Sequence, residues 1–250
     1  MMRKLPAYGK PNLDSDSGCH HPLSGLGRPM TLRACDLSAV AFDLDDTLFD
    51  RTAAVVLLLH DWLGELAPDA SAEILTRDAC GHSPREPFFH WLGETYPRLG
   101  CSGAELWARF RAELPQWLVA DPAAAPLLTQ LADAGLRTGV LTDGHSAGQR
   151  AKLQALGLAP RFAPERVLVT SELAAEKPDA RAFGALVGAL GVPAGRILFV
   201  GDHPEKDIAG AKRSGLKACW LRRQPGGGGA SADLVIDSLG DLFPLLWPPQ

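Results

Sequence analysis

AVAFDLDDTL, residues 39–48, decides the fold of this chain, because it joins an apolar run to a cluster of acids. Residues 39–42 are apolar without a break, which is typical of a strand buried on both faces of a parallel sheet. Successive side chains of an extended segment point to opposite faces, so Asp43 and Asp45 share one small volume while Leu44 turns into the core. Two like charges this close indicate a Mg²⁺ site, acid/base chemistry or both. Taken alone, the segment is equally compatible with a capped turn between a strand and a helix.

The bulk composition is that of a globular protein. The chain has 250 residues, 46% of them hydrophobic and 22% charged, enough for one large domain or a core with an insertion. Its net charge of −4 and the lack of a basic stripe argue against a nucleic-acid partner. Five scattered cysteines, without the spacing of a zinc site or a disulfide scaffold, predict free thiols in a reducing cytoplasm. No apolar run approaches the roughly 18–20 residues of a membrane span and no secretory signal is visible, so we expect a cytoplasmic protein without a membrane partner.

Apolar runs alternate with helical segments after residue 39, which predicts an α/β fold with a parallel sheet covered by helices. The expected strands are Val40 to Asp43, Thr138 to Thr142, Val167 to Thr170, Ile197 to Val200 and Ala218 to Leu221. Nearly a hundred residues separate the first two strands, far more than one crossover helix needs, so this interval must hold an inserted domain. Helical spacing of apolar residues and a capping box at Ser102 predict about four helices there.

The predicted elements divide the chain into three parts. Residues 37–50 and 121–250 form the core, and residues 51–120 form the helical insertion. Residues 1–36 are rich in Gly, Pro, Ser and Asp without a hydrophobic period, so we expect a disordered tail. We further hypothesise that Met30 is the physiological start; a loss of stability or activity on deleting the residues before it would contradict this.

Two polar motifs follow the second and third expected strands. Thr142, Asp143 and Gly144 offer a hydroxyl and the free amides of a glycine-containing turn, the groups that hold a phosphoryl oxygen. Lys177, before Pro178, would supply a point charge to a phosphate and to an attacking carboxylate. By themselves, an ordinary helix cap and an exposed lysine explain these two motifs equally well or better.

The fourth expected strand leads into a second pair of acids, Asp202 and Asp207. Mg²⁺ prefers oxygen ligands, so Asp43, Asp202 and the backbone carbonyl of Asp45 would make an adequate site. Asp207 could then orient Lys177 or a bound water.

Together, the four motifs resemble those of the haloacid dehalogenase-like (HAD) hydrolase superfamily, in its phosphatase type. The motifs are Asp43-Leu44-Asp45-Asp46-Thr47, Thr142, Lys177 with Pro178, and Gly201-Asp202 with Asp207. The resemblance covers Ala39 to about Leu242. It implies a Rossmann-like three-layer core with a parallel sheet, and an inserted all-helical cap domain of the family's first cap class that closes over the site and selects the substrate.

The resemblance implies a Mg²⁺-dependent phosphatase acting on a small phosphorylated metabolite. Asp43 would attack phosphorus and become an aspartyl-phosphate, and Asp45 would protonate the leaving oxygen and then activate water. The implied phosphate-binding residues are Thr142, Asp143 and Lys177, the implied metal ligands are Asp43, Asp45 and Asp202, and Asp207 has a supporting role. Many relatives have asparagine at the Asp143 position, so we expect this residue to bind through its backbone amide. His203 is expected to shape its turn or touch the leaving group, since imidazole suits softer metals.

Other functions remain to be weighed. Dehalogenation uses the same nucleophile but needs neither the Asp45 acid nor the Asp202 and Asp207 carboxylates, which favours phosphoryl transfer. A phosphomutase on the same core, or a non-enzymatic phosphate-binding scaffold, is the alternative. Neither the substrate nor the oligomeric state follows from the sequence. The candidate substrate contacts in the cap are Arg51, Arg77, His82, Arg85, His90 and Arg98, most of which we expect to be surface side chains.

Overall fold

The computed structural model describes residues 32–223 and 231–247. Most of the predicted tail, including Met30, lies outside these residues. Residues 32–36, which we assigned to the tail, lie against the core: Leu32 is buried and the 3-10 helix η1 spans Ala34–Asp36. The difference arises because Leu32 and Leu37 supply apolar side chains that pack into the core cluster.

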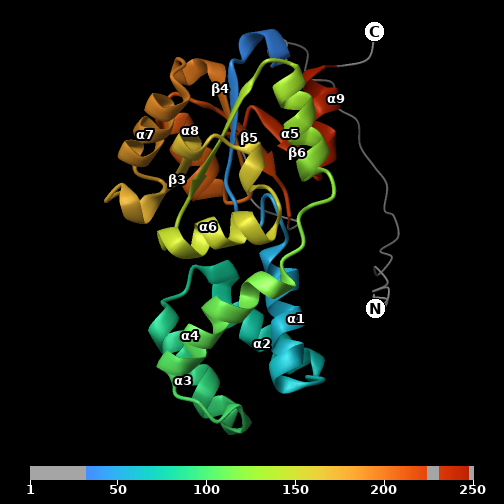
Figure 1. Cartoon of the computed structure of the whole chain (residues 1–250), viewed down its shortest axis with the longest axis vertical. Helices are drawn as coiled ribbons and strands as arrows, with labels where there is room; N and C mark the ends of the chain where they lie inside the picture. Colours follow the sequence, from blue (N-terminus) through green and yellow to red (C-terminus); the bar gives the residue numbers. More distant parts are fainter. Residues whose placement is uncertain (1–31, 224–230, 248–250) are drawn as a thin grey trace, which may run out of the picture. The chain divides into compact units, whose positions relative to one another are not determined.

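The described residues contain one six-stranded parallel sheet, with strand order β3-β2-β1-β4-β5-β6 (Figure 1). The strands are β1 (Ala39–Phe42), β2 (Arg137–Thr142), β3 (Val167–Val169), β4 (Ile197–Gly201), β5 (Lys217–Leu221) and β6 (Leu234–Ile236). The first five confirm the predicted strands to within about one residue at most ends. The edge strand β6 was not predicted, because it has three residues, two of them partly exposed, and shows no period.

The strands of the sheet carry apolar side chains on both faces, which makes the core a three-layer structure. In β1, Val40 and Phe42 belong to the cluster that includes α5, α6 and α9, whereas Ala39 and Ala41 belong to the cluster that includes α7 and α8. This alternation confirms the prediction of a strand buried on both faces. The helices are α5 (Ala124–Asp133), α6 (Ser146–Ala155), α7 (Ala180–Leu190), α8 (Gly210–Arg213) and α9 (Leu242–Leu246).

The insertion between β1 and β2 is helical, as the sequence predicts. Residues 51–117, all of them described, contain four α-helices, short 3-10 turns and no strand. The helices are α1 (Arg51–Leu63), α2 (Pro68–Asp78), α3 (Arg85–Thr95) and α4 (Gly103–Glu113). The side chain of Asp50 caps α1, and the capping box predicted at Ser102 and Glu105 begins α4. No helix in the described part of the chain has both the length and the apolar character needed to cross a membrane.

The two chain segments that join this helical cap to the sheet run side by side. Phe49 and Ala120 form an isolated antiparallel bridge, and the amide of Asp121 donates to the carbonyl of Leu48 at 2.9 Å. The Arg223 guanidinium, after β5, donates to the carbonyls of Asp46 and Thr47 and pairs with the Asp121 carboxylate at 3.2 Å. One arginine of the core therefore holds both connections to the cap, which fixes the entry to the insertion. The domain boundaries at residues 50 and 120 stay a prediction.

Candidate active site

The predicted site residues come together at the carboxyl edge of the sheet. Because β1 lies between β2 and β4 and all three strands are parallel, the loops that follow them meet at one edge of the sheet. The strand order reverses at β1, so the connections on its two sides lead in opposite directions. A pocket of about 420 Å³ opens there, with the cap on its other side. Its lining includes every predicted site residue: Asp43, Asp45, Thr142, Asp143, Lys177, Asp202 and Asp207. Their catalytic and ligand roles stay predictions.

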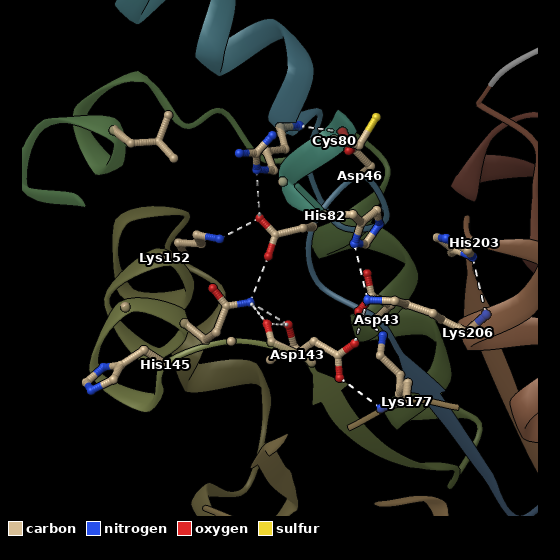
Figure 2. Close-up of a pocket in the computed structure, with 18 of the residues that line it drawn as sticks. Asp43, Asp46, Cys80, His82, Asp143, His145, Lys152, Lys177, His203 and Lys206 are labelled. Carbon is tan, nitrogen blue, oxygen red and sulfur yellow. Dashed lines mark hydrogen bonds and ion pairs between the residues drawn. The ribbon is translucent and has the colours of Figure 1, made fainter. Parts of the chain in front are cut away.

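Lys177 forms ion pairs with two carboxylates of the pocket. Its ammonium lies 2.5 Å from Oδ1 of Asp43 and 2.7 Å from Oδ1 of Asp207, and all three side chains are buried. Figure 2 shows Lys177 reaching Asp43 from below. Burial lowers the pKa of Lys177, but the carboxylates of Asp207 and Asp43 outweigh burial and raise this pKa above its ordinary value. The lysine is therefore charged, and Asp207 orients it.

Three carboxylates gather around this one ammonium. Oxygen atoms of Asp43, Asp202 and Asp207 lie within 4.8 Å of one another. Burial, followed by the neighbouring acids, raises the pKa of Asp202 to about 9, and burial raises that of Asp43 to about 7 despite Lys177. An excess of buried acid over base is costly unless a cation neutralises it, and oxygen donors are the ligands that Mg²⁺ takes. The donor set therefore fits a divalent cation. This set of donors includes the Asp207 carboxylate, whereas the side chain of Asp45 does not belong to the acid cluster. A ligand role for the Asp45 carbonyl stays a prediction.

The raised pKa values predict an unusual pH dependence of stability in metal-free protein. Folded Asp43 and Asp202 hold protons up to about pH 7 and pH 9, whereas an unfolded aspartic acid loses its proton near pH 4 (pKa about 3.9). The folded state thus binds more protons between about pH 4 and 9, so its stability falls as pH rises through this window. In EDTA, we expect a melting temperature several degrees lower at pH 8.5 than at pH 5.5.

Saturating Mg²⁺ should remove most of that fall, because it neutralises the ionised carboxylates. The variant Asp202→Asn, which cannot ionise, should show a flatter profile in EDTA and a weaker response to Mg²⁺. The measurement is thermal unfolding at both pH values, with and without metal. A wild-type profile in EDTA as flat as that of the variant would show that these acids are not held together as described.

Asp45 faces helix α6 instead of the acid cluster. Lys152 Nζ lies 2.5 Å from its Oδ1, Gln149 Nε2 donates to its Oδ2 at 2.7 Å, and Arg51 Nε lies 4.0 Å away. Burial pushes the pKa of Asp45 upward, but Lys152 and Arg51 outweigh burial and hold this pKa below its usual range. In this geometry Asp45 is an ionised carboxylate two residues from Asp43, the predicted nucleophile.

Gln149 joins Asp45 to Thr142 and Asp143, the predicted phosphate-binding residues. Its Nε2 also lies 2.5 Å from the Thr142 hydroxyl and 2.9 Å from the Asp143 carbonyl. The close packing needs glycine at position 144, where φ is +128° and a Cβ would lie 3.3 Å from the Gln149 side chain. Sequence reasoning missed Gln149 and Lys152. The signal that could have found them is their spacing of three on the helix that follows Thr142, which places both on one face.

The side chain of Asp143 contacts two lysines, whereas binding through its backbone amide stays a prediction. Its Oδ1 accepts from the Lys177 amide at 3.0 Å, and its Oδ2 lies 3.3 Å from Lys206 Nζ. In Figure 2, Lys206 reaches towards this group from the right. The Asp143 carboxylate is therefore partly neutralised by Lys206, a lysine that sequence reasoning missed.

His203 shapes the turn after β4, one of its two predicted roles. Its Nδ1 accepts from the amides of Glu205 and Lys206, at the start of a π-helical turn, η9 (Pro204–Ala209), that precedes α8. This wide turn brings Asp207 back over the strand end. This return requires Gly201, because a Cβ there would lie 2.6 Å from the Cβ of Asp207.

On the cap side, a buried acid holds two arginines. Asp78, at the end of α2, pairs with Arg51 at 2.5 Å and with Arg85 at 2.7 Å. Arg51 is buried, so it is an exception to the expectation that most of these side chains lie at the surface. It is buried because Asp78 and Asp45 satisfy its charge. The pairs fix the loop of residues 79–83, whose His82 faces Lys206 at 3.2 Å.

Only half of the six cap candidates line the pocket: Arg51, His82 and Arg85. Burial, then Lys206 and His203, lowers the pKa of His82 to about 4, so this ring is neutral at pH 7. The other three have partners elsewhere in the cap. Arg77 lies over the Trp91 ring, His90 pairs with Glu94, and Arg98 donates to the Leu63 carbonyl.

Removing the acid of this cap cluster should destabilise the protein strongly. Asp78→Asn leaves Arg51 buried without its bidentate partner, and breaking a buried ion pair from one side costs about 3–5 kcal/mol. We expect the melting temperature to fall by about 6–20 °C. Glu73→Gln is the matched control on the same helix, because it removes the exposed partner of Arg77, a pair worth about 1 kcal/mol or less. Equal, small shifts for the two variants would contradict the structural role of Asp78.

The comparisons with known proteins agree on one family. A family model described as haloacid dehalogenase-like hydrolase matches residues 37–215. A phosphoglycolate phosphatase of Rhodospirillum rubrum is 34% identical over 187 residues, covering 71% of this chain and 76% of that protein. A phosphoserine phosphatase of Thermus thermophilus is 36% identical over 142 residues, but the match spans only 55% of that protein and 56% of this chain. Among solved structures, a HAD phosphatase from Thermococcus onnurineus is 28% identical, with a TM-score of 0.61 over 84% of this chain and 98% of that one.

Proposed function

Since this chain belongs to the haloacid dehalogenase-like hydrolase family, we propose that it is a Mg²⁺-dependent phosphatase that hydrolyses a small phosphorylated metabolite through an aspartyl-phosphate. Its class, phosphoric monoester hydrolase, is supported by the family and by the phosphatases among its relatives. One observation carries the mechanism: a single buried lysine bridges Asp43 and Asp207 beside Asp202. The proposed nucleophile Asp43, the proposed cation ligands and the positive charge of Lys177 therefore lie close together.

In the first step, a carboxylate oxygen of Asp43 forms a bond to phosphorus as the bond from phosphorus to the leaving oxygen breaks. Lys177 favours the ionised form of Asp43 against the effect of burial, and together with the Thr142 hydroxyl it stabilises charge on the transferred oxygens. Mg²⁺, held by Asp43, Asp202 and the carbonyl of Asp45, would neutralise part of the same charge.

Asp45 would move protons in both steps. In the second step it takes a proton from the water that attacks the aspartyl-phosphate, which releases phosphate and restores Asp43. The lowered pKa of Asp45 keeps it ionised, the form that can accept a proton. To protonate the leaving oxygen in the first step, Asp45 must first take up a proton from solvent, which its ion pair with Lys152 opposes, so we expect substrate binding to displace this contact.

Other chemistries on this core fit the site less well. Dehalogenation would leave Asp45 and the paired acids Asp202 and Asp207 without a use. A phosphomutase needs a second phosphoryl acceptor in place of water, and a non-enzymatic scaffold needs no acid/base group beside the nucleophile. The complete set of groups for hydrolysis therefore favours the phosphatase.

The test is phosphate release by purified protein from a panel of sugar phosphates, nucleoside monophosphates, phosphoserine and phosphoglycolate, with Mg²⁺ or with EDTA. We expect release that depends on the metal and prefers one substrate class. Failure across the whole panel by folded, metal-binding protein would count against hydrolysis and favour the mutase or the scaffold.

A further inference from the structure

The ionisable side chains on the cap side of the pocket are predominantly basic. Apart from Cys80, they are Arg51, His82, Arg85 and Arg111, and no acid of the cap lines the pocket in the described part of the chain. His82 is neutral at pH 7, and the one carboxylate of Asp78 serves both Arg51 and Arg85. Counted over the cap side chains alone, three arginines against one aspartate leave an excess of two positive charges, part of which Asp45 of the core offsets at Arg51.

Arg111 is the arginine of this wall that remains available. The described residues supply carboxylate partners for Arg51, Arg85 and Arg109 but none for Arg111. Its guanidinium lies 5.1 Å from the centre of the Trp107 ring, a contact that leaves its hydrogen-bond donors unused. Trp107, Phe110, Arg111 and Leu114 line the pocket from positions i, i+3, i+4 and i+7, so one face of α4 continues into the pocket wall.

The aromatic residues near Arg111 do not provide a stacking platform. Trp107 is packed against Phe89, with ring centres 5.1 Å apart, and against Phe110 at 5.8 Å, and Arg111 lies over it. A nucleoside base would have to displace these contacts. The pocket, about 420 Å³ in all, must also hold the phosphoryl group, so the remaining space suits a short leaving group.

We propose that Arg111 is a specificity-determining residue that binds a second anionic group, carboxylate or phosphate, on the leaving group of the substrate. The proposal rests on the phosphatase function above. A guanidinium offers two parallel donors, which match a carboxylate or a phosphate in a bidentate pair. The phosphoryl group lies at Asp43 and Lys177, and the cap receives the other charge, which would otherwise be repelled by the acids of the core.

The test compares matched substrates that differ in the second charge. Phosphoglycolate is paired with 2-hydroxyethyl phosphate, and 1,3-propanediol bisphosphate with 3-hydroxypropyl phosphate, so that the two pairs distinguish a carboxylate from a phosphate. Uridine 5′-monophosphate tests the nucleotide alternative. We expect the wild type to prefer the charged member of one pair by tenfold or more in kcat/KM.

Arg111→Met keeps a long apolar stem over Trp107 but removes the charge. It should raise KM for the preferred anionic substrate by about 10- to 100-fold, the range of a charged hydrogen bond, with a much smaller change in kcat. Arg111→Lys should recover part of the preference. Arg109→Met is the control, because Arg109 lies on the same helix but pairs with Glu113 and lies over Trp62, outside the pocket lining.

Three results would overturn the proposal: equal use of charged and neutral members, an Arg111→Met variant that weakens both members equally, or a preference for the nucleotide. All three leave the phosphatase function intact. No phosphate release from any of the five substrates would instead contradict the proposed function, and this proposal with it.

Discussion

Asp43→Asn is expected to reduce kcat for phosphate release by about 10⁴-fold or more, the scale seen when a catalytic nucleophile is removed. The amide has nearly the shape of the carboxylate but cannot form the acyl-phosphate bond. Lys177 retains Asp207 as a partner, so the variant should fold. Its metal-free melting temperature should be equal to or above that of the wild type, because burial penalises the Asp43 charge that the substitution removes.

The measurement is the initial rate on the best substrate of the panel at saturating Mg²⁺, with thermal unfolding of both proteins as the control. A folded variant that keeps more than about one per cent of the wild-type rate would contradict a covalent mechanism through Asp43, because direct attack by water would then account for the turnover.

Lys177→Met should impair both catalysis and stability. It leaves the buried carboxylates of Asp43 and Asp207, and the half-buried one of Asp202 beside them, without the ammonium that lies between the first two. Removing one side of a buried ion pair costs about 3–5 kcal/mol, and the loss of charge at the phosphate should lower kcat by about 10²-fold or more.

The stability loss of this variant should depend on pH and metal. Without the lysine, the acids ionise less readily, so the folded state binds still more protons and stability falls more steeply as pH rises in EDTA. Mg²⁺ should restore part of the stability but not the rate. Lys212→Met is the control, since Lys212 pairs with Asp233 outside the pocket. Similar melting temperatures for the two variants at pH 8.5 in EDTA would show that Lys177 does not hold the acid cluster together.

The central strands and the meeting of the motifs could be predicted because both depend on local pattern. A continuous apolar run such as residues 39–42 identifies a strand buried on two faces, and parallel strands bring the residues after them to one edge. Asp43, Thr142 and Asp202 lie at the ends of apolar runs and Lys177 follows another run after a short loop, so their convergence needed no knowledge of side-chain packing.

The rest of the pocket depends on partners that are distant in sequence. Lys152 is 107 residues from Asp45, and Lys206 is 63 residues from Asp143, so no local period links either pair. Arg51 has the sequence context of an exposed residue in the first turn of a helix. It is buried only because α2 delivers Asp78 to it across 27 residues. Such contacts arise from tertiary packing, which composition and spacing do not encode.

Reductive trapping of the intermediate tests the central claim most directly. Protein turning over its best substrate with Mg²⁺ is quenched and treated with borohydride, which reduces an aspartyl-phosphate to homoserine, and the peptide containing residues 39–48 is examined by mass spectrometry. The mechanism predicts homoserine at position 43 and none in the Asp43→Asn protein. Rapid turnover with an unmodified Asp43, or with homoserine at another aspartate, would contradict it.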